Sequence, residues 1–356
     1  MESTEAIEVK MSRHLDNLTK PLGSLGRLED YCIKLAKIQG KVPPPAQKKC
    51  VYVFGGDHGV AAEGVSLYPP EVSYQQATNM LYGGAGINAL ATATGWEIAV
   101  VDAGINADFP PELIRGAAEA VPPKGRFIDA KIGRGTKNFY HEDAMSAAEL
   151  EAALKKGAEV AEDAIRRGYT MVAVGDLGIA NTATGAAMLV AAGLDHNLII
   201  DRGTGIDEAA LKHKRQVITE AVRLRAPGSA PRAIMRALGG FDLAEMTGFI
   251  LALKGKGIAC ILDGFPVTSA AYMAWLIDNS ITDYLFAGHL SRVSGHRVVL
   301  DKMGLEPAIS LGMRLGEGTG AVIGGFIVEL GAVCARDMAT FDTVDVSQAP
   351  TEEIKF

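Results

Sequence analysis

A chain of 356 residues with 48% hydrophobic content can bury a large core, and we expect one large domain and a smaller one. The net charge of −7 is mild, and no basic patch interleaved with aromatic residues occurs, which argues against nucleic acid as a partner. The acidic N-terminus has no apolar signal core, and no apolar run reaches the roughly 18 residues of a membrane span. We therefore expect a cytoplasmic protein that does not enter a membrane.

Cysteine and histidine spacing argues against a metal site. The four cysteines are far apart, with no Cys-x-x-Cys pair, so we expect them to be reduced and structural. The seven histidines form no His-x-x-x-His pair, so we expect no zinc held by the protein.

The first 45 residues predict a helical arm. It is broken at residues 20–29, where Pro21, Gly23 and Gly26 favour a turn. A packing role for this arm is favoured over a catalytic one. Three consecutive prolines at 43–45 then form a stiff connection to the main domain, expected over residues 46–340. Residues 341–356 are polar and acidic and predict a frayed tail.

The main domain alternates short apolar runs with stretches of helical period, which is typical of a parallel sheet built from βαβ units. Strands are predicted at 50–54, 98–101, 171–174, 258–262 and 284–287. Helices are predicted at 71–81, 146–167, 182–192, 208–224, 243–256, 268–277 and 321–338. Each strand is followed by glycine and a polar or acidic residue. Open α/β sheets bind ligands at the carboxyl ends of their strands, so these turns predict one common site.

Residues 311–321 set a single acidic residue, Glu317, between glycines. Glycine allows positive φ and exposes backbone N–H groups, so a ligand can approach this carboxylate closely. An equally good local interpretation is a helix N-terminus, at which Glu317 complements the helix dipole and Thr319 helps to cap.

Two further segments resemble nucleotide-binding loops. Residues 201–205, Asp-Arg-Gly-Thr-Gly, precede a run with Lys212, Lys214 and Arg215 and are the best candidate for a phosphate site, although an ordinary turn before a basic helix face explains them about as well. Residues 84–89 fit the letters of the dinucleotide fingerprint. They follow a helical pattern instead of a strand, so we do not expect a nicotinamide cofactor there.

Two acid–histidine pairs allow both catalytic and structural roles. Asp57 and His58 are adjacent, so on a strand they would point to opposite faces, and we favour a turn cap and a backbone contact. Asp263 and His289 end neighbouring strands and could orient a ligand or each other, with the structural role slightly favoured.

Taken together, these segments resemble the nicotinate-nucleotide:5,6-dimethylbenzimidazole phosphoribosyltransferases, the CobT family. The resemblance runs from Lys20 to about Phe341. It is carried by seven motifs in the same order: KPLGSLGRLE at 20–29, DHGV at 57–60, YPPEV at 68–72, GTKN at 135–138, GDLGIANT at 175–182, LDGF at 262–265 and RLGEGTGA at 314–321.

The resemblance implies transfer of phosphoribose from nicotinate mononucleotide to a lower-ligand base of a cobamide, without a cofactor. It implies a Rossmann-like open parallel sheet flanked by helices, a small helical domain from both chain ends, and a dimer. It places Glu317 as general base with Asp176 across the site. The implied phosphate and ribose ligands are Gly203, Thr204, Gly205, Lys214, Ser291 and Asn181, and the implied base pocket is Tyr68, Gln76, Leu177, Leu315 and Asp263.

Three departures from the family pattern bear on activity. Asp176 stands where the family usually has Glu. The shorter aspartate side chain would hold its carboxylate about 1 Å further back from the ligand. Ala180 and Ala183 alter a Gly-Asn-Thr-Thr segment, and Leu22 replaces a proline. These changes could suit the family branch that activates phenol or p-cresol through two related chains. The alternatives are therefore an active homodimer and a weakly active subunit of a heterodimer.

Overall fold

A seven-stranded sheet in the order β3-β2-β1-β4-β5-β6-β7 lies at the centre of the molecule in our computed structural model, which describes residues 6–119, 124–202, 205 and 207–348. All neighbouring strands are parallel. The strands are β1 (Lys49–Gly56), β2 (Glu97–Gly104), β3 (Arg126–Asp129), β4 (Met171–Leu177), β5 (Ala259–Leu262), β6 (Leu285–His289) and β7 (Pro307–Ile309).

Five of these strands confirm the sequence prediction, and two were missed. The missed strands, β3 and β7, lie at the two edges of the sheet and have only four and three residues. Both are largely half-exposed, so neither shows the continuous apolar run of a central parallel strand. The predicted fold class, a Rossmann-like parallel sheet flanked by helices, is confirmed.

The strand order reverses direction beside β1. From β1 the chain builds outward through β2 to β3, and from β4 it builds the opposite way to β7. The connections on either side of this point leave the sheet on different faces. A crevice therefore opens at the carboxyl ends of β1 and β4, where open α/β sheets bind ligands.

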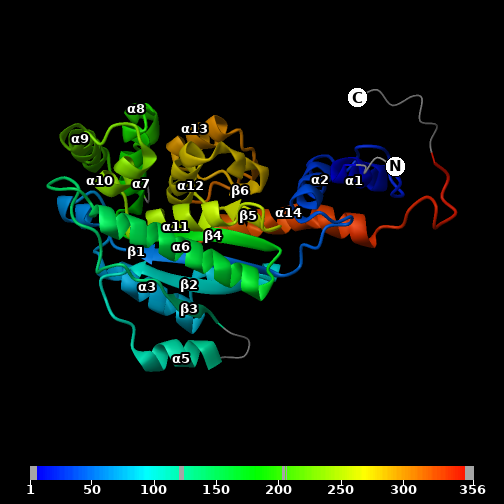
Figure 1. Cartoon of the computed structure of the whole chain (residues 1–356), viewed down its shortest axis with the longest axis horizontal. Coiled ribbons are helices and arrows are strands. Elements are labelled where there is room, and N and C mark those ends of the chain that lie inside the picture. Colours follow the sequence, from blue (N-terminus) through cyan, green and yellow to red (C-terminus); the bar gives the residue numbers. More distant parts are fainter. Residues whose placement is uncertain (1–5, 120–123, 203–204, 206, 349–356) are drawn as a thin grey trace.

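Alternate residues of β1 belong to different hydrophobic cores on the two faces of the sheet. Tyr52 and Phe54 pack against α6 (Ala147–Arg167), α7 (Asn181–Ala191), α11 (Phe241–Ala252) and α12 (Phe265–Ile277). Val51 and Val53 pack against α3 (Glu71–Tyr82), α4 (Gly86–Thr94) and α14 (Thr319–Asp337). Figure 1 shows α6 and α11 on one side of the strands and α3 on the other. Burial on both faces explains why the strands read as unbroken apolar runs.

The remaining helices flank this framework. They are α5 (Pro111–Glu119), α8 (His196–Ile199), α9 (Glu208–Arg225), α10 (Pro231–Leu238) and α13 (Ser294–Met303), with 3₁₀ turns η1 (Gly59–Glu63) and η2 (Asn279–Asp283). All seven predicted helices form. The helix α12 begins three residues earlier than predicted, because Pro266 fits the first turn of a helix. The helices α4, α5, α8, α10 and α13 were not predicted, and the glycine-rich segment at 84–89 that imitates a dinucleotide fingerprint runs into the start of α4.

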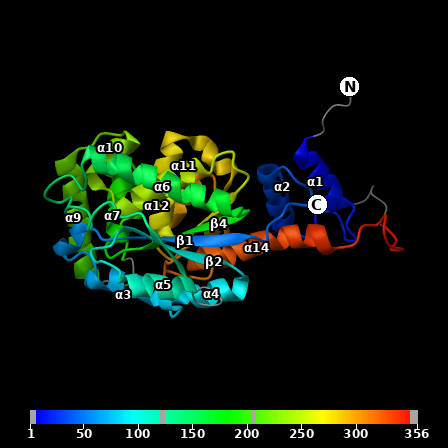
Figure 2. The same cartoon turned by 60° about the horizontal axis from the view of Figure 1, so that its bottom comes forward.

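Two N-terminal helices and the end of α14 form a separate projection. The helices α1 (Ile7–Asp16) and α2 (Arg27–Gln39) pack with Ala335 around Met11, Leu15 and Cys32. Leu18 also pairs with Thr340 in an isolated β-bridge. Both views place this projection beside one end of the α/β body (Figures 1 and 2). The contact joins both ends of the chain, while the predicted boundaries at residues 45 and 340 stay a prediction.

The helix α14 is the one helix in the described residues that is long and apolar enough to cross a membrane by length and composition. Most of this segment is buried, against β4 to β7 on one part and α2 on another. A core helix passes the same test, and this packing accounts for its composition.

The buried acid Glu245 on α11 offers a test of this core. Its side chain is fully buried, and neither carboxylate oxygen has a hydrogen-bond partner among the described residues. Burial, and then the charges of Asp242 and Asp102, raise the pKa of Glu245 well above its ordinary value. Folding therefore takes up a proton here, and the stability present below the ordinary pKa is lost as pH rises towards the folded pKa.

Replacing Glu245 with Gln should therefore stabilise the protein above about pH 5, by up to about 1.4 kcal/mol for each further pH unit within this range. Denaturant unfolding at several pH values measures the effect. The control is Glu162→Gln on the exposed face of α6. An unchanged pH slope in the Glu245 variant would contradict the assignment of a proton to this side chain.

Candidate active site

A cleft of about 380 Å³ opens at the carboxyl ends of the central strands. The ends of β4 and β6, the starts of α7 and α12, the helix α3 and the loop before α14 all contribute to it. Its lining is Tyr68, Val72, Gln76, Asp176, Leu177, Gly178, Ile179, Asn181, Thr182, Gly264, Phe265, Pro266, His289, Ser291, Val293, Arg314, Leu315, Gly316 and Glu317. The structure thus brings together turns that are far apart in the sequence.

Glu317 sits in a tight loop over the end of β4. Gly316, Glu317 and Gly318 have φ of 85°, 63° and 83°, so three consecutive residues are left-handed. The Glu317 N–H donates to the Asp176 carbonyl at 3.1 Å, which fixes the loop to the strand. A left-handed non-glycine residue costs about 1 kcal/mol or more, and such strain is concentrated at functional sites.

The Glu317 carboxylate is held by two donors. Gln76 Nε2 donates to Oε1 at 2.6 Å, and the Ile87 N–H donates to Oε2 at 3.4 Å. Burial raises the pKa of Glu317 above its ordinary value, while the bonds from Gln76 and Ile87 oppose the rise. The side chain is 4% exposed and lines the cleft. A carboxylate of this kind can accept a proton from a bound molecule.

Asp263, which directly follows β5, anchors the Glu317 loop. Its two oxygens accept the Gly318 and Ala321 N–H groups, each at 3.0 Å, and His289 Nε2 lies 3.4 Å from Oδ1. The resemblance implies contact with the base, but among the described residues Asp263 does not line the cleft, because its oxygens are committed to the first turn of α14. The predicted pairing with His289 is the arrangement found.

Asp176 faces the cleft from the end of β4. The amide of Asn181 donates to Asp176 Oδ2 at 2.6 Å, and Oδ1 is buried without a hydrogen-bond partner among the described residues. Ala180, where the resemblance implies glycine, has φ of 71° at the start of α7. The departure from the family pattern therefore falls on a left-handed position that glycine occupies without strain.

Three helix N-termini line one part of the cleft. Asn181 and Thr182 begin α7, Phe265 and Pro266 begin α12, and Val293 precedes α13. Helix N-termini carry unpaired N–H groups and the positive end of the dipole, and they commonly hold phosphate. Ser291 adds a hydroxyl to the same region.

Lys214 supplies a cation directly behind this region. Its Nζ donates to Thr182 Oγ1 at 3.0 Å, and its side chain is 2% exposed. Burial lowers the pKa of Lys214 to about 8, and the nearby charge of Asp201 opposes this shift. Gly205 is exposed, and the predicted phosphate ligands Gly203 and Thr204 lie outside the described residues.

The part of the cleft beside Glu317 is more apolar. The predicted base-binding residues Tyr68, Gln76, Leu177 and Leu315 all line it. Tyr68 and Leu315 are more than half exposed at the rim. A large apolar surface at a cleft mouth is suited to cover a flat ring.

Some lining residues were not identified from the sequence. Arg314 and Phe265 are part of the cleft although their motifs were noted only for neighbouring residues. Asp57 was expected to cap a turn, and its Oδ2 accepts the Asn106 N–H at 2.8 Å from the segment after β2, which is a structural contact but not a local cap. His58 was expected to bond to backbone, and its Nε2 instead lies 3.1 Å from Asp242 Oδ2.

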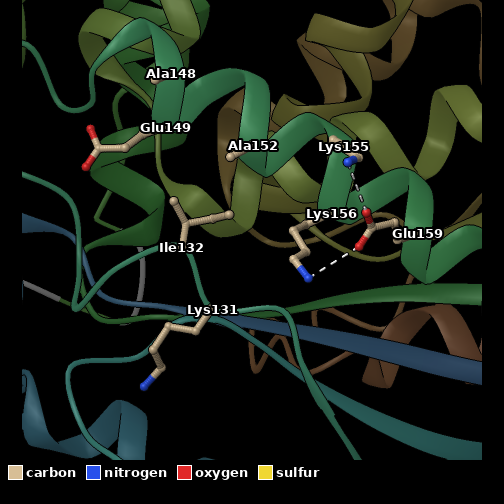
Figure 3. Close-up of a pocket in the computed structure, with 8 residues that line it drawn as sticks. All are labelled: Lys131, Ile132, Ala148, Glu149, Ala152, Lys155, Lys156 and Glu159. Atoms are coloured by element: carbon tan, nitrogen blue, oxygen red, sulfur yellow. Dashed lines mark ion pairs between the residues drawn. The ribbon is translucent and has the colours of Figure 1, made fainter.

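A second hollow of about 550 Å³ lies beside α6, between that helix and residues 131–132 (Figure 3). Lys155 and Lys156 both pair with Glu159, while Lys131 points away and pairs with Asp102. The Lys155 and Lys156 ion pairs with Glu159 are exposed and contribute little to stability, and the hollow lacks the convergent polar groups found in the cleft.

Comparisons with known proteins agree with this geometry. A family model described as a phosphoribosyltransferase matches residues 2–346. A nicotinate-nucleotide–dimethylbenzimidazole phosphoribosyltransferase of Chlorobaculum tepidum is 43% identical over 94% of this chain and 92% of its own. That of Geobacter sulfurreducens is 40% identical over 94% and 92%.

The solved structures agree as well. The crystal structure of CobT from Thermus thermophilus has a TM-score of 0.89 and 39% identity, covering 97% of this chain and all of that one. The chain therefore belongs to the nicotinate-nucleotide–dimethylbenzimidazole phosphoribosyltransferase family.

Proposed function

We propose that this enzyme transfers phosphoribose from nicotinate mononucleotide to an aromatic lower-ligand base, with Glu317 as the general base. The observation that carries the proposal is the position of Glu317, a buried carboxylate in a strained loop between an apolar rim and three helix N-termini. A ligand with an aromatic ring at one end and a phosphate at the other matches this division.

The chemistry requires little help for the leaving group. Nicotinate bound to ribose is a pyridinium, so the electron pair of the breaking C1′–N bond neutralises its nitrogen. One nitrogen of dimethylbenzimidazole forms the new bond to C1′ from the opposite side, which inverts β to α. The proton on the other nitrogen passes to Glu317, and this transfer is the step at which a carboxylate contributes.

The phosphate would bind where α7, α12 and α13 begin. Thr182, Ser291 and the N–H groups of these turns are its proposed ligands, with Lys214 supplying charge through Thr182. Tyr68, Leu177 and Leu315 would cover the base, and Asn181 would hold Asp176 across from Glu317. Gly203, Thr204 and Gly205 are proposed as part of the phosphate loop.

Phenol or p-cresol is a proposed alternative acceptor. A phenol attacks through oxygen and must lose its proton, so the same carboxylate would serve. Asp176 and Ala180, which depart from the family pattern, favour a second proposal: a weakly active subunit that works with a homologous chain. We propose a cytoplasmic dimer in both cases.

Incubating the purified chain with nicotinate mononucleotide and either dimethylbenzimidazole or phenol should release nicotinate, measured by chromatography. The ribotide formed in a competition between the two acceptors identifies the preferred base. If folded protein releases no nicotinate with either acceptor, the proposal fails for the isolated chain. Activity that appears only with a co-purifying homologous chain would favour the partner-subunit alternative.

A further inference from the structure

Three buried polar side chains form a row from the interior to the cleft. His58 follows β1, Asp242 lies in the first turn of α11, and Asp176 ends β4. Their residues are 3%, 0% and 4% exposed, and Asp176 is the member that lines the cleft. In the part of the chain that the structure describes, no group of three His, Cys, Asp or Glu residues is arranged to hold a metal, so another explanation is needed.

The contacts in this row require a shared proton. Asp176 Oδ1 is buried and has no hydrogen-bond donor among the described residues, and Asp242 is the neighbouring charge that acts most on the pKa of Asp176. Two ionised carboxylates buried this close repel each other and can only accept hydrogen bonds, so we expect one of them to carry a proton. His58 Nε2 lies 3.1 Å from Asp242 Oδ2.

The surroundings decide which carboxyl group holds the proton. Asp242 Oδ1 accepts the Leu243 N–H at 2.8 Å, and the N-terminal turn of α11 and His58 both favour a negative charge on Asp242. Among the described residues, the donor to the Asp176 side chain is the neutral amide of Asn181 at 2.6 Å. The donors therefore favour an ionised Asp242 and a protonated Asp176.

We propose that His58 and Asp242 are positioning residues that keep a proton on Asp176, so that Asp176 presents the cleft with a neutral carboxyl group. The fit around them is close. A Cβ added at Gly240 would lie 2.2 Å from Asp242 Oδ1 and 2.5 Å from His58 Cε1, and one at Gly178 would lie 3.0 Å from His58 Nε2. Glycine at these two positions lets three elements bring the row together.

The directions of titration agree with this arrangement. Burial, and then the charge of Asp242, raise the pKa of Asp176 well above its ordinary value. Burial lowers the pKa of His58, but Asp242, with a smaller contribution from Asp57, outweighs it and raises that pKa overall. Asp263 adds further negative charge near Asp176, which also disfavours a charge on Asp176.

A neutral Asp176 has a consequence that rests on the proposed function. Nicotinate mononucleotide carries a carboxylate and a phosphate, so a second ionised acid facing the cleft would repel it. A protonated Asp176 removes this repulsion and leaves Glu317 as the acid that exchanges a proton with the acceptor base.

Infrared difference spectra test the proton directly and need no substrate. Subtracting the spectrum of Asp176→Asn from that of the wild type near pH 7 should leave the C=O band of a protonated carboxylic acid. Raising the pH should remove this band only well above the ordinary range of a carboxyl group. A difference that contains only carboxylate bands near pH 7 would overturn the proposal.

Two variants then test the roles of the partners in opposite directions. Asp242→Asn removes the negative charge and adds an amide donor, so the pH at which the Asp176 band disappears should fall by about one unit or more. His58→Gln removes the group that favours an ionised Asp242, so part of the shared proton should move to Asp242 and weaken the Asp176 band near pH 7, while the pH at which the pair loses its proton should not fall. Simple loosening of the fold would lower it in both variants, and that result would contradict the proposal.

The control is Asp163→Asn, which removes a partly buried acid bonded to Tyr52 and should leave the Asp176 band unchanged. In nicotinate-release assays, Asp242→Asn should raise the KM for the mononucleotide by about tenfold at alkaline pH while changing kcat less. A band without any nicotinate release would leave this inference standing and reject the proposed function. Nicotinate release without the band would reject this inference and leave the proposed function standing.

Discussion

Replacing Glu317 with Gln should lower kcat by about 10²- to 10⁴-fold, because the amide keeps the shape of the carboxylate but cannot accept the proton of the attacking base. Nicotinate release under saturating substrates measures this loss. The KM for the mononucleotide should change little, since the proposed role of Glu317 lies in proton transfer. The Gln76 side chain can rotate its amide to bond the new side chain, so the loop should keep its position.

The pH dependence gives an independent check on Glu317. Its raised pKa means that the carboxylate form is lost at a higher pH than for an ordinary glutamate. Activity of the wild type should therefore fall on the acid side with a midpoint above the usual carboxyl range, and the residual activity of the variant should lack this limb. Glu306→Gln, at an exposed position, is the matched control. Near-normal turnover by the Glu317 variant would reject the mechanism without rejecting the family.

The sheet could be predicted from the sequence because its central strands are buried on both faces. That burial requires unbroken apolar runs, and the carboxyl ends then converge by topology alone. This is why Asp176 and Glu317, separated by more than a hundred residues, could be assigned to one cleft. The edge strands β3 and β7 could not be found, because short, half-exposed strands need no such runs.

The contact between the buried side chains of His58 and Asp242 could not be predicted from the sequence for a different reason. His58 and Asp242 belong to different elements, and nothing in the local pattern of either indicates that they meet. The predicted start of α11 fell at residue 243, so Asp242 lay outside the helix whose first turn it occupies. The role of Asp263 could not be predicted either, because it depends on its contacts with the Gly318 and Ala321 N–H groups at the start of α14, which is distant in the sequence.

The second large effect is expected at Asp263. Asp263→Asn should destabilise the protein by about 3–5 kcal/mol at neutral pH, the usual cost of breaking a buried, paired charge. An asparagine keeps one acceptor, but its NH₂ group would face one of the two N–H donors of Gly318 and Ala321. His289 would also lose the carboxylate beside it. Denaturant unfolding measures the change in free energy.

The pH profile separates the loss of the charge from a loss of packing. Burial tends to raise the pKa of Asp263, but its bond with His289 and the two N–H groups lower it overall. A depressed pKa contributes stability that is present above the ordinary carboxyl pKa and lost as pH falls through the folded value. The wild type and the variant should therefore converge in stability below about pH 4.

The kcat of the Asp263→Asn variant should give a second measure of how Asp263 anchors the Glu317 loop. If the Asp263 variant remains folded, displacement of the Glu317 loop by about 1 Å should lower kcat by roughly 10²-fold. The control is Asp163→Asn, which removes a carboxylate bonded to Tyr52 on β1, outside the cleft and the Glu317 loop. Full activity and unchanged stability in Asp263→Asn would show that the first turn of α14 holds Glu317 in place without the Asp263 carboxylate. The Glu317 carboxylate would then be positioned by its own strained backbone, by the bond of its N–H to the Asp176 carbonyl, and by Gln76 and Ile87.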